Sequence, residues 1–270
     1  MSELRLAVLG AGNMGSALIA GAIRDGVVDK NISFTSLDSE AGQRLVEGLG
    51  VSLVATNQQA VTDSDLVIVA VKPKDIAAVL LEVAPVISAS TVVVSVAVGI
   101  DLATLAAYLP AGQPIIRAMP NTPSVIGKGV IALSANQFVT AGQLSLAESV
   151  LRGSGIVVVV PENEQAAIGA ISGSGPAFVA YFLEALIEAG VHQGLSRALA
   201  TELAVATVAG TAEMIGETGE HPAVAREKVT SPGGTTAAGL AELDRGGVRA
   251  AVLNAVAASV RRTKEIAAGS

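Results

Sequence analysis

The stretch VTSPGGTT, at residues 229–236, contains residue types whose spacing could do chemistry. A proline and two glycines lead directly into two threonines and an apolar, helix-like pattern. Such a loop frees backbone amides at the positive end of a helix, where together they can bind a carboxylate. Ser231, Thr235 and Thr236 add hydroxyl donors. Capping the helix would need only one hydroxyl, so the sequence favours ligand binding over capping alone.

A second glycine-rich stretch, GAGNMG, follows the first apolar run and opens a helical pattern. This is the dinucleotide fingerprint in the context that it requires. The first glycine makes a tight turn, the second lets the backbone approach a pyrophosphate, and the third lets helix and strand pack closely. The helix N-terminus then stabilises the phosphate charge. The sequence therefore predicts a nucleotide site at Gly10, Ala11, Gly12, Asn13, Met14 and Gly15.

The tip of the second predicted strand bears on the choice of nucleotide. NAD sites usually place a carboxylate there, against the ribose hydroxyls. Here Thr35 and Ser36 offer hydroxyls that can donate to a 2′-phosphate, and Asp38 follows them closely. The hydroxyls favour NADPH. The alternatives are NADH held by Asp38, or hydroxyls that are ordinary turn residues.

Three further motifs lie beside predicted strands or helices. In a doubly wound sheet, ligands bind beyond the carboxyl ends of the strands. We therefore expect AVKP, at 70–73, to contact the cofactor, mainly through its backbone because Lys72 is equally well explained as a solvated side chain. We expect MPNTP, at 119–123, to form the floor of the cleft where nicotinamide and substrate meet. The segment 171–176, with Pro176 at the start of a long helix, is expected to serve packing and to shape the site indirectly.

Two kinds of element must position these motifs. Short β-branched runs in the first 160 residues predict strands at 4–10, 31–36, 51–55, 65–71, 90–98, 114–120, 129–135 and 155–160. After Pro161, helical patterns follow at 162–171, 176–190, 196–216, 222–228, 234–245 and 247–267. The sequence thus predicts an α/β Rossmann domain at 1–161, doubly wound around a mostly parallel sheet. An all-α domain for substrate binding and dimerisation follows at 162–270.

Composition narrows the function further. The chain has 270 residues, a net charge of −7 and no cysteine. The acidic balance argues against nucleic-acid or anionic-membrane partners. Without cysteine, and with His192 and His221 far apart, we expect no metal site. The N-terminus has no basic segment, and glycines and Pro176 interrupt the uncharged run at 166–183, so we expect a cytoplasmic protein without membrane spans.

The predicted helices at 176–190 and 196–216 are apolar on nearly every face. Such helices must be buried on nearly all sides. A domain of about 110 residues has too little interior to bury both alone. The sequence therefore predicts an intimate homodimer through the helical domain, with a tight monomeric bundle as the alternative.

Taken in order and spacing, GAGNMG, AVKP, MPNTP, SGSGPAF and VTSPGGTT resemble the pyrroline-5-carboxylate reductase family over essentially the whole chain. The resemblance implies an NAD(P)H-dependent oxidoreductase that reduces the C=N bond of 1-pyrroline-5-carboxylate to L-proline, the last step of proline biosynthesis. It also implies a homodimer, or a higher oligomer of dimers. One departure is Phe178, where a tyrosine often follows GSGPA in the family.

The resemblance also implies site residues, motif by motif. The residues that it places at the substrate are Ser231, Gly233, Gly234, Thr235 and Thr236. Those that it places at the cofactor are Gly10 to Gly15, Ser36, Asn57, Ala70, Val71, Lys72, Pro73 and Ala97.

Reduction of an imine needs few protein groups. Hydride comes from the nicotinamide, and a cyclic imine can bind already protonated, so neither histidine nor cysteine is required. Thr236 is the candidate catalytic residue, as a donor that orients the ring nitrogen. One alternative is another two-domain NADP-dependent dehydrogenase or imine reductase, although 162–218 lacks the lysine that the hydroxyacid type needs. The other is a nucleotide-sensing module without catalysis, which would not need the PGGTT loop.

Overall fold

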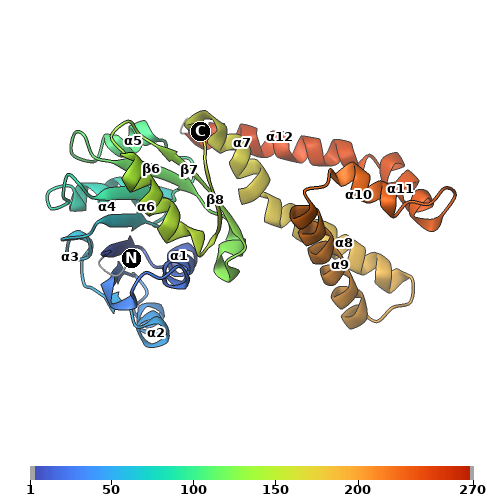
Figure 1. Ribbon diagram of the computed structural model, residues 1–270, viewed down its shortest axis with the longest axis horizontal. Coiled ribbons are helices and arrows are strands. Elements are labelled where there is room, and N and C mark those ends of the chain that lie inside the picture. Colours follow the sequence, from blue (N-terminus) through green and yellow to red (C-terminus); the bar gives the residue numbers. More distant parts are fainter. Residues whose placement is uncertain (1–3, 268–270) are drawn as a thin grey trace. The chain divides into compact units, whose positions relative to one another are not determined.

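The computed structural model describes residues 4–267 and divides the chain into two compact units (Figure 1). The first unit comprises Met1–Gly173 and Val260–Ser270, and the second comprises Ser174–Ser259. The domain boundary predicted at 161/162 lies where strands give way to helices, because the last strand ends at Val159 and a 3-10 helix begins at Glu162.

An eight-stranded sheet forms the centre of the first unit, with strand order β3-β2-β1-β4-β5-β6-β7-β8. Only β6 and β7 pair antiparallel within the described sheet. The strands are β1 (Leu6–Leu9), β2 (Ile32–Thr35), β3 (Ser52–Leu53), β4 (Leu66–Val69), β5 (Val92–Ser95), β6 (Ile115–Met119), β7 (Gly129–Ala135) and β8 (Gly155–Val159). The predicted doubly wound, mostly parallel sheet is confirmed.

Helices cover both faces of this sheet (Figure 1). Residues of α1 (Asn13–Arg24), α2 (Ser39–Leu49) and α6 (Ala141–Arg152) pack on one face. Residues of α3 (Asn57–Val61), α4 (Ile76–Val83) and α5 (Leu102–Ala106) pack on the other. Strand β1 is buried at all four positions, because successive side chains point to opposite faces and each face is covered.

The second unit is helical. It contains α8 (Gly175–His192), α9 (Arg197–Thr218), α10 (Pro222–Lys228), α11 (Thr235–Arg245) and the first part of α12 (Val248–Ala267). Helices α8 and α9 pack against each other. The Ser196 side chain accepts the Leu199 amide at the start of α9, and Gly219 ends that helix with a positive φ of 63°. The predicted all-helical second half is therefore observed.

The structure corrects one expectation about this half. Glycines and Pro176 interrupt the apolar run less than expected, because one helical stretch extends from Glu162 to His192 with only a bend at Ser174. It passes through η4 (Glu162–Glu164), α7 (Gln165–Ile168) and a π-helical segment, η5 (Gly169–Gly173), before α8. The wider π turn absorbs the irregularity. Pro176 sits in the first turn of α8, where its fixed φ suits the start of a helix.

Candidate functional site

The three glycines of the GAGNMG turn differ in what surrounds them. Gly10 has a φ of +89°, and a Cβ there would lie 2.7 Å from Val71 Cγ1. A Cβ on Gly15 would lie 2.5 Å from the Gly10 carbonyl oxygen. A Cβ on Gly12 would meet no atom within 4 Å. Gly10 and Gly15 therefore build the turn, while Gly12 leaves open space on its outer side.

That open space lies at the N-terminus of α1. Gly12 is the N-cap residue and supplies no side-chain hydrogen bond to the helix. An α-helix leaves the amides of its first turn without internal acceptors, and its dipole favours negative charge there. Gly12 and Asn13 are both exposed. The turn is therefore suited to a phosphate group.

The other predicted cofactor residues lie around the same edge of the sheet. Strands β2, β1, β4 and β5 are parallel neighbours, so their carboxyl ends point the same way. From β1 the chain adds strands on one side as far as β3 and then on the other side from β4 onward. Doubly wound folds bind ligands at this switch point between β1 and β4. The residues that follow these strand ends are Gly10, Ser36, Ala70 to Pro73, and Ala97.

Asn57 is tied to this edge by a chain of hydrogen bonds that sequence analysis did not find. Thr35 Oγ1 donates to Asn57 Oδ1 at 2.7 Å, and Asn57 Nδ2 donates to Glu82 Oε2 at 2.7 Å. The hydroxyl hydrogen of Thr35 is therefore engaged within the protein. Of the two hydroxyls expected to face a 2′-phosphate, the structure directs that of Thr35 inward.

The remaining hydroxyl belongs to Ser36, which donates to the Asp38 carbonyl oxygen at 2.9 Å. Asp38 itself caps α2, because its Oδ1 accepts the Ala41 amide at 2.9 Å. The carboxylate thus has a structural role at the start of a helix. It need not contact a ribose to be explained.

The AVKP segment leaves β4 with its first two residues half-buried and Lys72 and Pro73 exposed. The Ala70 amide donates to the Leu9 carbonyl at 2.8 Å, which holds the segment beside the glycine turn. Lys72 precedes a 3-10 helix, Pro73–Asp75, and makes no capping bond to it. The backbone of this segment is therefore held more firmly than the exposed side chain of Lys72.

Ala97, after β5, is buried, and the loop that carries it is anchored by an ion pair. Arg117 Nη1, on β6, lies 3.2 Å from Glu162 Oε1, and the same oxygen accepts the Leu102 amide at 2.8 Å. The arginine side chain is only 13% exposed. This contact joins the sheet, the start of α5 and the first helical residues after β8.

Asp101 caps the same end of α5. Its carboxylate accepts hydrogen bonds from the side chain and the amide of Thr104, and these lower the pKa of Asp101, with a smaller contribution from the positive charge of Arg117. The charged form is thus favoured at the end of the loop that carries Ala97.

The MPNTP segment follows β6, and its asparagine points inward. Asn121 is 7% exposed. Its Oδ1 accepts the Val130 amide, and its Nδ2 donates to the Ser172 carbonyl oxygen, both at 2.8 Å. The side chain of Asn121 is therefore engaged in joining segments of the protein, a role that the motif alone did not indicate.

The second glycine-rich loop belongs to the helical unit. Gly233 has a φ of +69°, a conformation that favours glycine. Gly234 is the N-cap residue of α11, and its amide donates to the Ser231 carbonyl at 3.0 Å. A Cβ on Gly234 would clash with Ser231 Oγ. Both glycines are therefore required by the shape of the loop itself.

The threonines after this loop do not cap the helix. The N-cap residue is Gly234, and no side chain makes a capping bond to α11. Within residues 4–267, the hydroxyls of Thr235 and Thr236 have no hydrogen-bond partner. Thr235 is exposed and Thr236 is half-buried. The loop thus offers uncapped amides and unengaged hydroxyls at one helix end.

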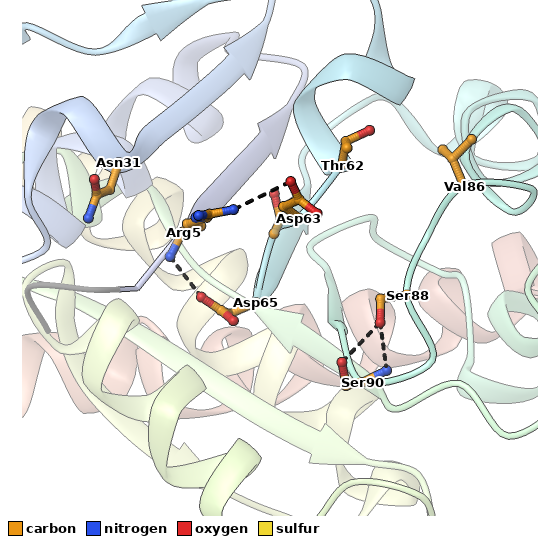
Figure 2. A pocket seen from close by; sticks show the side chains of 9 residues that line it. Arg5, Asn31, Thr62, Asp63, Asp65, Val86, Ser88 and Ser90 are labelled. Atoms are coloured by element: carbon orange, nitrogen blue, oxygen red, sulfur yellow. Dashed lines mark hydrogen bonds and ion pairs between the residues drawn. The ribbon is translucent and has the colours of Figure 1, made fainter.

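A hollow in the first unit lies away from the predicted cofactor residues of that unit. Figure 2 shows the ion pair of Arg5 with Asp63, at 3.5 Å, and the Arg5 amide donating to Asp65, at 2.9 Å. Arg5 and Asp65 come immediately before β1 and β4, and Ser90 comes shortly before β5. The hollow is therefore at the amino ends of the strands. Gly10 and Ala70 lie at the opposite edge of the sheet, after the carboxyl ends of β1 and β4.

Comparison with known proteins places this geometry in a family. Residues 162–266 match the family model described as pyrroline-5-carboxylate reductase dimerisation, and residues 5–99 match NADP oxidoreductase coenzyme F420-dependent. The pyrroline-5-carboxylate reductase of Corynebacterium melassecola is 41% identical over 264 residues, which cover 97% of this chain and 98% of that protein. The chain belongs to the pyrroline-5-carboxylate reductase family.

Solved structures of pyrroline-5-carboxylate reductases agree with this assignment. The one from Coxiella burnetii is 36% identical, with a TM-score of 0.92 over 97% of this chain and 98% of that one. The Plasmodium falciparum reductase with NADP bound is 29% identical, with a TM-score of 0.89 over 99% of both chains. The resemblance seen in the sequence, and the fold class that it implied, are confirmed.

The dimerisation match covers the two apolar helices of the second unit. In α9, only Ala200 and Ala204 are buried among the described residues, and in α8 Tyr181 is 77% exposed. By length and composition, the helices 162–192 and 197–218 could each cross a membrane. Both helices lie within residues 162–266, which match the dimerisation family model.

Proposed function

We propose that this protein is a pyrroline-5-carboxylate reductase that uses NADPH to convert 1-pyrroline-5-carboxylate to L-proline. The observation that carries the proposal is the loop before α11, where amides and the hydroxyls of Thr235 and Thr236 are left without partners in the described structure. Family membership supports the same reaction. In this proposal the predicted domain 1–161 binds the cofactor and 162–270 binds the substrate.

The substrate has two polar groups that suit this loop. Its carboxylate and its ring nitrogen are attached to the same carbon, so adjacent protein groups can bind both. We assign the carboxylate to the first-turn amides of α11 that follow the Gly233–Gly234 turn, with the hydroxyls of Ser231 and Thr235, and the nitrogen to Thr236. A hydroxyl both donates and accepts, so Thr236 can serve a neutral or a protonated nitrogen.

The cofactor side is assigned to the carboxyl edge of the sheet. The α1 amides after Gly12 hold the pyrophosphate, AVKP and Ala97 flank the nucleotide, and Ser36 contacts the 2′-phosphate. Asn57 supports this edge through Thr35. NADP in the Plasmodium falciparum relative supports NADPH as the preferred reductant here, ahead of NADH.

Bound NADPH supplies hydride to the imine carbon, while the electron pair of the C=N bond moves to nitrogen. The protein then needs to orient the ring and to hold the charge of the carboxylate, which the loop before α11 does. Its half-buried position restricts water around Thr236. No strongly acidic side chain is required when the imine arrives protonated.

We further propose that the active species is a homodimer, or a higher oligomer of dimers, in the cytoplasm. The exposed apolar faces of α8 and α9 support subunit contact. The acidic net charge of −7 argues against nucleic-acid or anionic-membrane partners.

An assay of NADPH oxidation with purified protein and 1-pyrroline-5-carboxylate tests the proposed function. We expect imine-dependent loss of NADPH absorbance and an equal amount of proline by mass spectrometry. Reactions without the imine provide the control. Tight binding of NADPH without turnover would refute the reductase and support a nucleotide-sensing role.

A further inference from the structure

Asn121 joins two segments that are distant in sequence. Its Nδ2 donates to the Ser172 carbonyl, 51 positions away, while its Oδ1 accepts the Val130 amide at the start of β7. Both distances are 2.8 Å and the side chain is buried. The bond to Ser172 reaches the π-helical segment 169–173, where the chain leaves the first unit.

The Ser172 carbonyl needs a donor from outside its own helix. In a regular α-helix, this oxygen would accept the amide hydrogen four residues later. That residue is Pro176, which has no amide hydrogen. Ser172 is itself buried, and an unpaired buried carbonyl is costly. Asn121 supplies the donor that proline removes.

Met119 reinforces the same contact. Cβ atoms placed on Gly169 and Gly173 would lie 3.1 and 2.9 Å from Met119 Cε. The methionine side chain therefore packs directly on the two glycines that bound the π-helical segment. Residues 119 and 121 of the MPNTP motif thus hold this segment by packing and by a hydrogen bond.

We infer that Asn121 is a positioning residue for the reduction, acting through the carbonyl of Ser172. The inference rests on the proposed function. The segment that it holds is continuous with α8, which begins the helical unit that carries the PGGTT loop. By fixing the path of this helix, Asn121 orients the substrate loop for hydride transfer without contacting substrate or cofactor.

Asn121→Asp tests the donor alone. The aspartate keeps an acceptor for the Val130 amide but, when ionised, has no hydrogen for Ser172. We expect kcat to fall about tenfold or more, with the Kd for NADPH unchanged, because orientation changes while the glycine turn does not. A kcat equal to that of the unmodified protein would overturn the inference.

Asn136→Asp is the matched control. Asn136 Nδ2 donates to the Gln113 carbonyl at 2.9 Å, and its Oδ1 accepts the Ile115 amide at 3.2 Å. The arrangement is the same, but its partners lie at or just before the start of β6 and not in the π-helical segment that leads to α8. We expect a comparable loss of Tm and an unchanged kcat. If both substitutions lowered kcat equally, Asn121 would have only a structural role and the inference would be overturned.

Rescue by a second substitution makes the test independent of folding losses. Pro176→Ala restores the amide hydrogen that can reach Ser172. We therefore expect Asn121→Ala/Pro176→Ala to recover kcat relative to Asn121→Ala. Hydrogen exchange of 169–176 should quicken in Asn121→Ala and slow again in the double variant. No recovery in either measurement would overturn the inference.

The two proposals fail in different ways. If the unmodified protein does not reduce the imine, the proposed function fails, and hydrogen exchange alone still tests the hold of Asn121 on the π-helical segment. If it does reduce the imine but kcat is indifferent to Asn121, only the positioning role fails.

Discussion

Substitution of Thr236 by alanine distinguishes a catalytic role from a structural one. A catalytic role predicts a lower kcat/KM with an unchanged Tm, and a structural role predicts a lower Tm with an unchanged kcat/KM. The Thr236 hydroxyl has no partner among the described residues, and Gly234 provides the N-cap of α11. Removing the hydroxyl therefore costs the fold no hydrogen bond. Alanine is also the better helix former, by up to about 0.7 kcal/mol. We expect an unchanged or slightly raised Tm.

The same substitution should lower turnover strongly. A hydrogen bond to a charged group contributes roughly 1.5–3 kcal/mol, which corresponds to about a ten- to hundredfold loss. The loss should appear in kcat/KM for the imine, because the ring nitrogen is less well oriented in the transition state. The Kd for NADPH should stay the same. Thr235→Ala should be milder, since the loop amides still hold the carboxylate.

Thr230→Ala is the matched control for this experiment. Thr230 Oγ1 donates to the Arg226 carbonyl at 2.6 Å, near the end of α10. Its loss should lower Tm and leave kcat/KM unchanged, the reverse of Thr236→Ala. Steady-state kinetics and thermal unfolding of the three variants make the comparison. A Thr236→Ala enzyme with normal kcat/KM would refute the catalytic assignment.

Three further predictions concern the turns and one carboxylate. Gly233→Ala should raise KM for the imine, because the positive φ costs a side chain about 1–2 kcal/mol; unchanged KM in steady-state assays would contradict this. Gly15→Ala should weaken NADPH binding in calorimetry, since the new Cβ would crowd the Gly10 carbonyl at 2.5 Å; an unaltered Kd would count against the fingerprint site. Asp101 has a lowered pKa in the folded protein, so its charge stabilises the fold above its unfolded pKa of about 3.9, and this contribution disappears as pH falls through the folded value. Urea unfolding should therefore find Asp101→Asn less stable than the parent at pH 7 and nearly equal under strongly acidic conditions; a difference that persists in acid would disprove it.

Much of the fold could be read from the chain because its signals are local. The β-branched runs and helical spacings record the period of each element, and the eight predicted strands appear within residues 4–267. The two glycine loops were also visible, since Gly10 and Gly233 stand where the backbone needs a positive φ and a helix follows. Turn conformations and helix ends depend on residues that are adjacent in the sequence, so the sequence alone can predict them.

Only the tertiary structure showed which polar side chains form hydrogen bonds within the protein and which are left for a ligand. Thr35 and Asn57 are 22 positions apart, and their hydrogen bond turns inward a hydroxyl that the sequence offered to a ligand. Asn121 reaches Ser172 across 51 positions, and its amide donates to a carbonyl that Pro176, four residues later, has no amide hydrogen to serve. The period of a segment does not encode such partners. They depend on which strand ends and helices packing brings together, because a hydrogen bond requires its two atoms to meet within about 3 Å.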